Sequence, residues 1–121
     1  RQTGLTCFLP TLRSERNWGC GDFRDLVNYA AAFRGQGFSF LALNPLHALA
    51  NRSPYNVSPY SPLSLLRLNL IYAVVEDIPE FSRSRLAQRL LADPRILAQI
   101  ESLRSSPEVD YEGVARLKLF F

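Results

Sequence analysis

Side chains able to do chemistry are concentrated in the polar segment 12–23, whose sequence is LRSERNWGCGDF. This segment holds the only Trp of the chain and alternates charged with polar residues. It lies between an apolar run at residues 5–9 and a helix-like run at residues 26–33. A charged loop that leaves a buried strand is costly to hold in place, so we interpret it as part of a binding surface rather than of the core.

The acidic residues of this segment are expected to be structural. Asp22 directly precedes the helical pattern and is predicted to cap that helix. Glu15 lies between Arg13 and Arg16, and we expect the three to brace the loop, with Glu15 as an ion-pair partner of a neighbouring Arg. We therefore predict no catalytic residue here, and Asp25 is not a candidate either.

Metal and thiol chemistry are not indicated. The chain has two cysteines, Cys7 and Cys20, one His and no Cys-x-x-Cys motif. This inventory predicts neither a metal site nor a disulfide framework, and a reducing, cytoplasmic location fits it best. Cys7 falls in an apolar run and is expected to be buried as a small hydrophobe.

The elements that must position the polar segments form a predicted strand–helix–strand unit at residues 4–9, 23–33 and 38–43. Short connections between these elements require a parallel sheet, which gives an α/β fold class. The second strand is a nearly continuous apolar run, typical of a strand covered on both faces. Polar residues follow each strand, at 13–22 and 44–60, and parallel sheets build their sites at these carboxyl ends.

The second half of the chain has a helical texture. Three helices are predicted, at residues 82–91, 94–103 and 109–121. No third strong strand follows residues 71–75, so the predicted sheet is incomplete. We accordingly divide the chain into residues 1–72, with the strands, and residues 73–121, with the helices.

Composition narrows the function classes. With 47% hydrophobic and 21% charged residues, the chain can build a core. Thirteen of its fourteen basic residues are Arg and the net charge is +3, but no adjacent run of basic residues appears, so nucleic-acid binding is a minority interpretation.

No apolar run is long enough to span a membrane, and no signal peptide is predicted. Because the sequence begins mid-pattern without Met, we expect it to be cut from something longer.

Four motifs occur in order along the chain. They are residues 12–23 (LRSERNWGCGDF), 43–49 (LNPLHAL), 58–61 (SPYS) with Asn69 beyond it, and 109–111 (VDY) with Lys118. This ordered set resembles the N-terminal part of bacterial 4-alpha-glucanotransferases, the amylomaltases, and the similarity covers nearly the whole chain. The resemblance implies an α-amylase-like (β/α)8 TIM barrel. Since such a barrel needs about 250 residues, this chain would supply its first β/α units and part of an inserted helical region.

The resemblance also implies an activity. Such enzymes break and rejoin α-1,4-glucan chains by a retaining double displacement, with another glucan or glucose as acceptor and without a cofactor. The nucleophilic Asp, the acid/base Glu and a stabilising Asp of the family lie on later strands, outside this sequence. We therefore expect the 121-residue chain alone to be inactive. Its expected partners are maltooligosaccharides or other α-1,4-glucans and the remainder of its own barrel.

Five residues are candidates for substrate contact under this resemblance. Tyr60 matches the family's tyrosine beside the glucose ring at the cleavage point, where an aromatic face packs on a sugar. Ser58 and Asn69 could bond sugar hydroxyls, although Asn serves equally well in turns and caps. His47 follows the second strand and could contact a hydroxyl or simply complete the rim. Trp18 could stack on glucose, or could equally pin its loop to the barrel.

One further function class stays open. A stand-alone carbohydrate-binding or scaffold module could keep the sugar-contacting face without the catalytic carboxylates.

Overall fold

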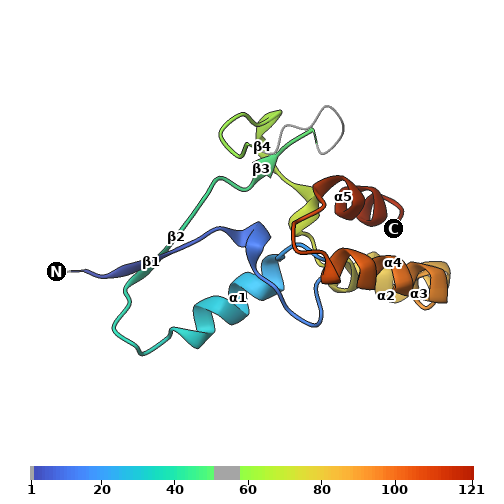
Figure 1. Cartoon of the computed structure of the whole chain (residues 1–121), viewed down its shortest axis with the longest axis horizontal. Helices are drawn as coiled ribbons and strands as arrows, with labels where there is room; N and C mark the ends of the chain where they lie inside the picture. Colours follow the sequence, from blue (N-terminus) through green and yellow to red (C-terminus); the bar gives the residue numbers. More distant parts are fainter. Residues whose placement is uncertain (1, 51–57) are drawn as a thin grey trace.

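The computed structural model describes residues 2–50 and 58–121. The first of two Ser-Pro-Tyr tripeptides, with Tyr55, lies outside the described residues. Strand β1 (Gly4–Cys7) and strand β2 (Phe40–Leu43) pair in parallel, with α1 (Phe23–Ala32) between them in the chain. The predicted strand–helix–strand unit is therefore confirmed, and Figure 1 shows its strand pair and α1 on the side of the N-terminus.

Helix α1 begins and ends where the sequence provides signals for it. The Asp22 side chain accepts hydrogen bonds from the backbone N–H groups of Arg24 and Asp25, and Asp25 in turn accepts one from the backbone of Asp22. This reciprocal arrangement is a capping box, in which orphan donors at the helix start are satisfied. Beyond the helix, Gly35 has a φ of 82°, which suits the chain reversal toward β2. The predicted N-cap is confirmed.

Strand β2 departs from the expectation that both its faces are covered. Phe40 and Leu43 are exposed, and β1 is the only strand paired with β2 among the residues that the structure describes. The apolar run thus forms a strand as predicted. Its composition is typical of a strand that is buried on both faces, but the described residues do not bury both faces of β2.

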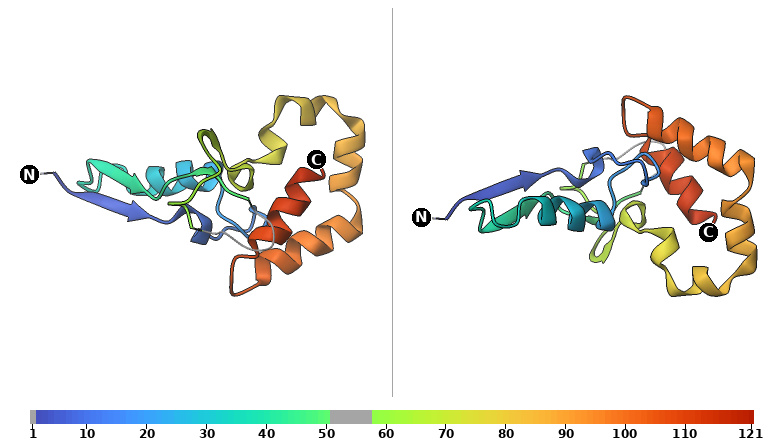
Figure 2. Two further views of the ribbon diagram at one scale, coloured as in Figure 1. Left: turned by 90° about the horizontal axis from the view of Figure 1, so that it is seen from above. Right: turned by 90° about the horizontal axis from the view of Figure 1, so that it is seen from below.

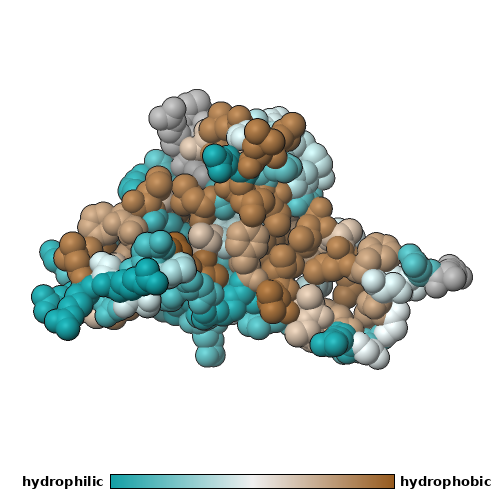
Figure 3. Space-filling model, turned by 180° about the vertical axis from the view of Figure 1, so that it is seen from behind, coloured by the Kyte–Doolittle hydropathy of each residue, from teal (hydrophilic) through white to brown (hydrophobic). Residues whose placement is uncertain are grey.

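A second small sheet was not predicted. Strand β3 (His47–Ala48) pairs antiparallel with β4 (Ser64–Leu68), in a unit that stands apart from β1 and β2 (Figure 1). Strand β4 contains Leu65, Leu66 and Leu68, of which the first two are adjacent and point to opposite faces, and all three are exposed. The exposed apolar residues on and beside it are Leu63, Leu65, Leu66 and Leu68. Figure 3 shows apolar surface over this part of the molecule.

The second half of the chain is helical, as predicted. It contains α2 (Pro79–Arg83), α3 (Arg85–Leu91), α4 (Pro94–Ser105) and α5 (Tyr111–Leu119), preceded by 3₁₀ turns at Leu70–Tyr72 and Val75–Asp77. The predicted helix at 82–91 is wrong in its start. Ser84 ends α2 and caps α3 through a hydrogen bond from the N–H of Ala87, so the chain bends there. In Figure 2, α2, α3 and α4 form an arc around α5.

Two buried clusters join these parts. One contains Leu9, Cys20, Ile71, Tyr72, Val114 and Ala115, and the other contains Trp18, Val75, Ile100 and Leu117. Both include residues from the polar segment and from α5, so the helical region is packed directly on the first loop. Among the described residues, no helix has the length and apolar character needed to cross a membrane.

Candidate functional site

The polar segment after β1 and the N-cap of α1 are held by a buried carboxylate, Asp25. Its side chain accepts hydrogen bonds from Ser14 Oγ at 2.8 Å and from Asn17 Nδ2 at 2.8 Å. Arg16 donates to Asp25 at 3.0 Å and to Asp22 at 2.5 Å. Burial alone would raise the pKa of Asp25, but the bonds from Asn17 and Ser14, the backbone N–H of Asp22 and the charge of Arg16 together lower it. Asp25 is thus a structural carboxylate whose two oxygens already accept hydrogen bonds within the protein.

The predicted bracing role of the arginines is confirmed, but one predicted partner is wrong. Arg16 pairs with Asp22 and Asp25 rather than with Glu15. Arg13 donates to the carbonyl of Gly19 at 2.6 Å and reaches the carbonyl of Ser106 at 3.3 Å. The carboxylates of α1 offer Arg16 a buried partner with several further donors, which the exposed neighbour in sequence cannot match.

The indole of Trp18 faces the helical region. Only 4% of this residue is exposed, its ring meets Phe121 edge-on at 5.4 Å, and its Nε1 donates to Glu76 at 3.3 Å. Arg104 of α4 additionally donates to the backbone carbonyl of Asn17 at 2.9 Å. Of the two roles considered for Trp18, this geometry matches the one that pins the loop.

Tyr60 lies on the surface beside the end of β2. Its residue is 71% exposed, and its hydroxyl accepts a 3.0 Å hydrogen bond from Nδ2 of Asn44. The ring is therefore held at one end by its hydroxyl, while its faces are open. Ser58 is exposed nearby in the chain, and its carbonyl accepts a bond from the N–H of Ser61.

His47 lies on β3, three residues beyond Asn44. Its Nδ1 is buried and has no hydrogen-bond partner among the described residues, although the residue as a whole is only half-buried. Buried polar atoms of this kind are normally satisfied by protein, water or ligand. The backbone partner of His47 across the small sheet is Leu68.

Asn69 is built into the fold rather than onto its surface. The residue is 2% exposed, its Oδ1 accepts from the N–H of Ile71 at 3.3 Å, and its own N–H donates to the carbonyl of Leu46 at 2.9 Å. Asn69 thus caps the 3₁₀ turn and ties it to the residue before His47. This matches the capping role that was considered for it.

The five predicted residues are therefore brought together only in part. Tyr60 is linked to Asn44, and Asn69 to Leu46 beside His47, whereas Trp18 is buried against the helices. Sequence reasoning missed the partnership of Asn44 with Tyr60, for which no local pattern exists. It also missed Asp25 as the centre of the loop network. The Asp22–Asp25 spacing was the available signal, because an acidic residue three positions after an N-cap is typical of a capping box.

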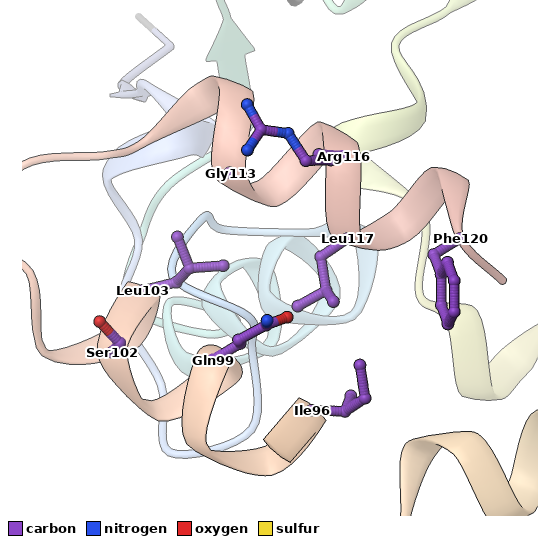
Figure 4. A pocket seen from close by; sticks show the side chains of 8 residues that line it. All are labelled: Ile96, Gln99, Ser102, Leu103, Gly113, Arg116, Leu117 and Phe120. Carbon is purple, nitrogen blue, oxygen red and sulfur yellow. The ribbon is translucent and has the colours of Figure 1, made fainter. Parts of the chain in front are cut away.

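A separate groove lies between α4 and α5. It has a volume of about 460 Å³ and is mainly apolar, with Gln99, Ser102 and Arg116 among its lining residues (Figure 4). None of the predicted site residues lines it.

The chemistry available on this face is hydrogen bonding and aromatic packing. The carboxylates of Asp22 and Asp25 are already paired, and both thiols are buried, with the pKa of Cys20 raised to about 12 chiefly by burial. The residues described contain no cluster of three or more His, Cys, Asp or Glu side chains that could hold a metal ion. An exposed Tyr ring whose hydroxyl is bonded to a side-chain amide suits a neutral polyhydroxyl ligand.

Comparisons with known proteins agree with one another. Residues 8–121 match the family model described as 4-alpha-glucanotransferase. A 4-alpha-glucanotransferase of Haemophilus influenzae is 41% identical over 116 residues, and one of Mycobacterium tuberculosis is 41% identical over 87 residues. These matches cover 96% and 66% of this chain. The crystal structure of amylomaltase from Corynebacterium glutamicum superposes with a TM-score of 0.82 at 33% identity and covers 98% of this chain.

The chain is short beside these relatives. It covers 17% of the Haemophilus protein, 12% of the Mycobacterium protein and 17% of the Corynebacterium chain.

Proposed function

The chain belongs to the 4-alpha-glucanotransferase family, and we propose on this basis that it is part of an enzyme that transfers α-1,4-glucan segments to another glucan or to glucose. One observation carries the proposal: a 4-alpha-glucanotransferase is 41% identical to this chain over 116 residues, which are 96% of its length. Loop residues carry function more often than core residues do.

We propose that the parallel pair β1–β2 with α1 is the beginning of a (β/α)8 barrel. The high TM-score to an amylomaltase supports this, as does the exposure of β2, which leaves room for a further strand. In such barrels the active site is built at the carboxyl ends of the strands. The polar segment after β1 and the Asn44 turn after β2 both occupy that position.

The proposed reaction is a retaining double displacement. It needs one carboxylate to attack the anomeric carbon and a second to protonate the leaving oxygen, about 5–5.5 Å apart. Asp22 and Asp25 do not suit these roles, because both are buried and paired with Arg16. The catalytic Asp, Glu and Asp would therefore come from the remainder of the enzyme, and this chain would provide substrate contacts without a cofactor.

Among those contacts, Tyr60 is the principal candidate. Its exposed ring can pack on a glucose face while the bond from Asn44 fixes its hydroxyl. His47 is the second candidate, because the residue is only half-buried and its imidazole could exchange a hydrogen bond with a sugar hydroxyl. We propose that Ser58, two residues before Tyr60, also forms a hydrogen bond with a sugar hydroxyl. For Asn69 and Trp18, burial supports roles in shaping the face rather than in touching the sugar.

The test uses the full-length transferase that carries this segment. Tyr60→Ala should lower kcat/KM for glucose transfer between maltotriose molecules about three- to tenfold, as expected for an aromatic contact, whereas Tyr60→Phe should retain most of it. Tyr29→Ala is the matched control, because Tyr29 of α1 packs on Phe33 at the C-cap of that helix. An unchanged kcat/KM in Tyr60→Ala would remove Tyr60 from the proposed site.

The alternative is a carbohydrate-binding or scaffold module without catalysis. It is favoured by the combination of an exposed Tyr60 with carboxylates that are already paired. Calorimetry with maltooligosaccharides separates the two. Clear binding by a monodisperse 121-residue chain supports the module, whereas transfer only in the longer protein supports the enzyme. Two buried free thiols are in keeping with a cytoplasmic location, which we retain as a proposal.

A further inference from the structure

Lys118 is a buried cation in the last turn of α5. Only 8% of the residue is exposed, and its Nζ donates to the backbone carbonyls of Ile71 and Ala73, at 2.5 Å and 2.6 Å. Its Nζ also lies 6.0 Å from the centre of the Trp18 ring. Lys118 takes part in none of the ion pairs among the described residues. Burying an ammonium group is costly unless its donors are satisfied. At this position the carbonyls of Ile71 and Ala73 satisfy them.

The carbonyls that Lys118 binds belong to a segment that leads to the proposed sugar face. The N–H of Ile71 donates to Oδ1 of Asn69, and the N–H of Asn69 donates to the carbonyl of Leu46. Leu46 directly precedes His47. A continuous set of hydrogen bonds therefore runs from the helical region, through the 3₁₀ turn, to the residue before His47 on β3.

The groups around Lys118 are consistent with a fixed structural cation. Burial lowers its pKa, while Asp22, Cys20 and Glu76 act in the opposite direction. Glu76 is also the acceptor of the Trp18 indole, so the same neighbourhood fixes the Trp loop.

We propose that Lys118 is a positioning residue, which fixes the turn 69–73 and thereby the place of His47 on the proposed substrate face. This inference rests on the proposed function for its catalytic consequence. It assigns α5 the task of setting the geometry of a site that its own side chains do not touch.

The first test compares two substitutions on α5 in the full-length transferase. Lys118→Met removes the donor and keeps much of the stem, whereas Arg116→Gln removes an exposed cation that is paired with Glu112. Lys118→Met should raise the KM for maltotriose about three- to tenfold with a smaller change in kcat, because a misplaced contact weakens substrate binding. Arg116→Gln should leave both constants near the parent values.

A double-mutant cycle distinguishes positioning from general damage. If Lys118 acts through His47, Lys118→Met should raise KM much less in a His47→Ala background than in the parent. An equal rise in both backgrounds would overturn the inference. So would a parental KM in folded Lys118→Met.

Hydrogen exchange gives a readout that does not depend on glucan binding. In the full-length protein, Lys118→Met should speed exchange of the amides of Asn69 and Ile71, and unchanged exchange there would overturn the inference. If Lys118→Met does not fold, Lys118→Gln, which keeps a donor on a shorter side chain, takes its place. Exchange of the amides of Asn69 and Ile71 is then measured in that variant, and unchanged exchange would again overturn the inference. A parental KM in His47→Ala would refute the proposed sugar contact alone, and the exchange result would then decide the role of Lys118.

Discussion

Asn17 Nδ2 donates a buried 2.8 Å hydrogen bond to Oδ2 of Asp25, and this bond joins the polar loop after β1 to the first turn of α1. The same Asn17 uses its Oδ1 to accept from the N–H of Gly19 and its Nδ2 to reach the carbonyl of Leu12. One fully buried amide therefore organises the loop from within, while one carboxylate anchors it to the helix. A loop held by such internal hydrogen bonds can keep its surface side chains in a fixed arrangement.

Asp25→Ala should destabilise the protein by about 1–3 kcal/mol, because it leaves Asn17 with an unsatisfied buried donor and Arg16 with Asp22 as its remaining partner. Asp93→Ala is the control, since Asp93 caps α4 but pairs with Arg95 at the surface. Its loss should cost much less, because Asp93 is a cap at the surface whose N–H donors can turn to water. Thermal unfolding of the full-length variants measures the difference, and equal losses would contradict the central role of Asp25.

Asp25 should also make stability fall in acid. Its pKa is lowered in the folded protein, so the folded state binds fewer protons than the unfolded state in the window between the two pKa values. The contribution is complete above the unfolded value of about 3.9 and is lost as pH falls through the lower folded value. Unfolding midpoints measured from pH 6 down to pH 2 should show a steep decline that Asp25→Asn flattens.

The local elements of this fold could be predicted because their signals are local. Asp22 before an apolar periodicity predicts the start of α1, and the two apolar runs with a helix between them predict a parallel pair. The β3–β4 pairing could not be predicted in this way, because β3 contains only His47 and Ala48 and is defined by its partner. Likewise, Ser84 reads as an ordinary helix residue until its capping bond divides two helices.

The candidate site was predictable in its residues but not in their surroundings. Tyr60 and His47 were identified by motif, and the 71% exposure of Tyr60 is consistent with ligand contact, whereas His47 is only half-buried. The burial of Trp18 depends on Phe121, about a hundred positions away, and that of Asn69 on a bond to Leu46. Such contacts are set by tertiary packing, for which a single sequence carries no periodic signal.

Gly19→Ala should be more damaging than Gly35→Ala. Both glycines have positive φ, 90° and 82°, so a side chain at either costs about 1–2 kcal/mol of backbone strain. A Cβ at Gly19 would also collide with the backbone carbonyl of Leu103 in α4, whereas a Cβ at Gly35 meets open space. Thermal midpoints of the two variants should therefore differ, and near-identical values would show that α4 can move away from the loop.

Cys20 should resist alkylation in the folded protein. Its residue is fully buried, and burial raises the pKa of its thiol to about 12, although the charges of Lys118 and Arg13 act in the opposite direction. Because the thiolate is the reactive species, iodoacetamide at pH 8 should modify it only through unfolding. A Ser105→Cys variant places a thiol on an exposed position as the control and should react promptly. Rapid labelling of Cys20 in native buffer would show that the core between α5 and the loop opens readily.

The exposed leucines of β4 give the sharpest test of the proposed barrel. Leu66 is 91% exposed in this chain, and Leu86 on α3 is exposed as well. If the remainder of a barrel covers β4, Leu66→Lys should destabilise the full-length enzyme by several kcal/mol, because it buries an unpaired charge, whereas Leu86→Lys should have little effect.

In the isolated 121-residue chain, Leu66→Lys should be the more beneficial of the two substitutions rather than the more damaging. There we expect self-association through the open strands, and Leu66→Lys should reduce it more than Leu86→Lys does, as measured by sedimentation velocity and binding of an apolar dye. A parental chain that sediments as a monomer and melts sharply would contradict the view that the remainder of the enzyme covers β4 and β2. So would a full-length Leu66→Lys enzyme of unchanged stability, since a covered β4 cannot accept that charge without cost.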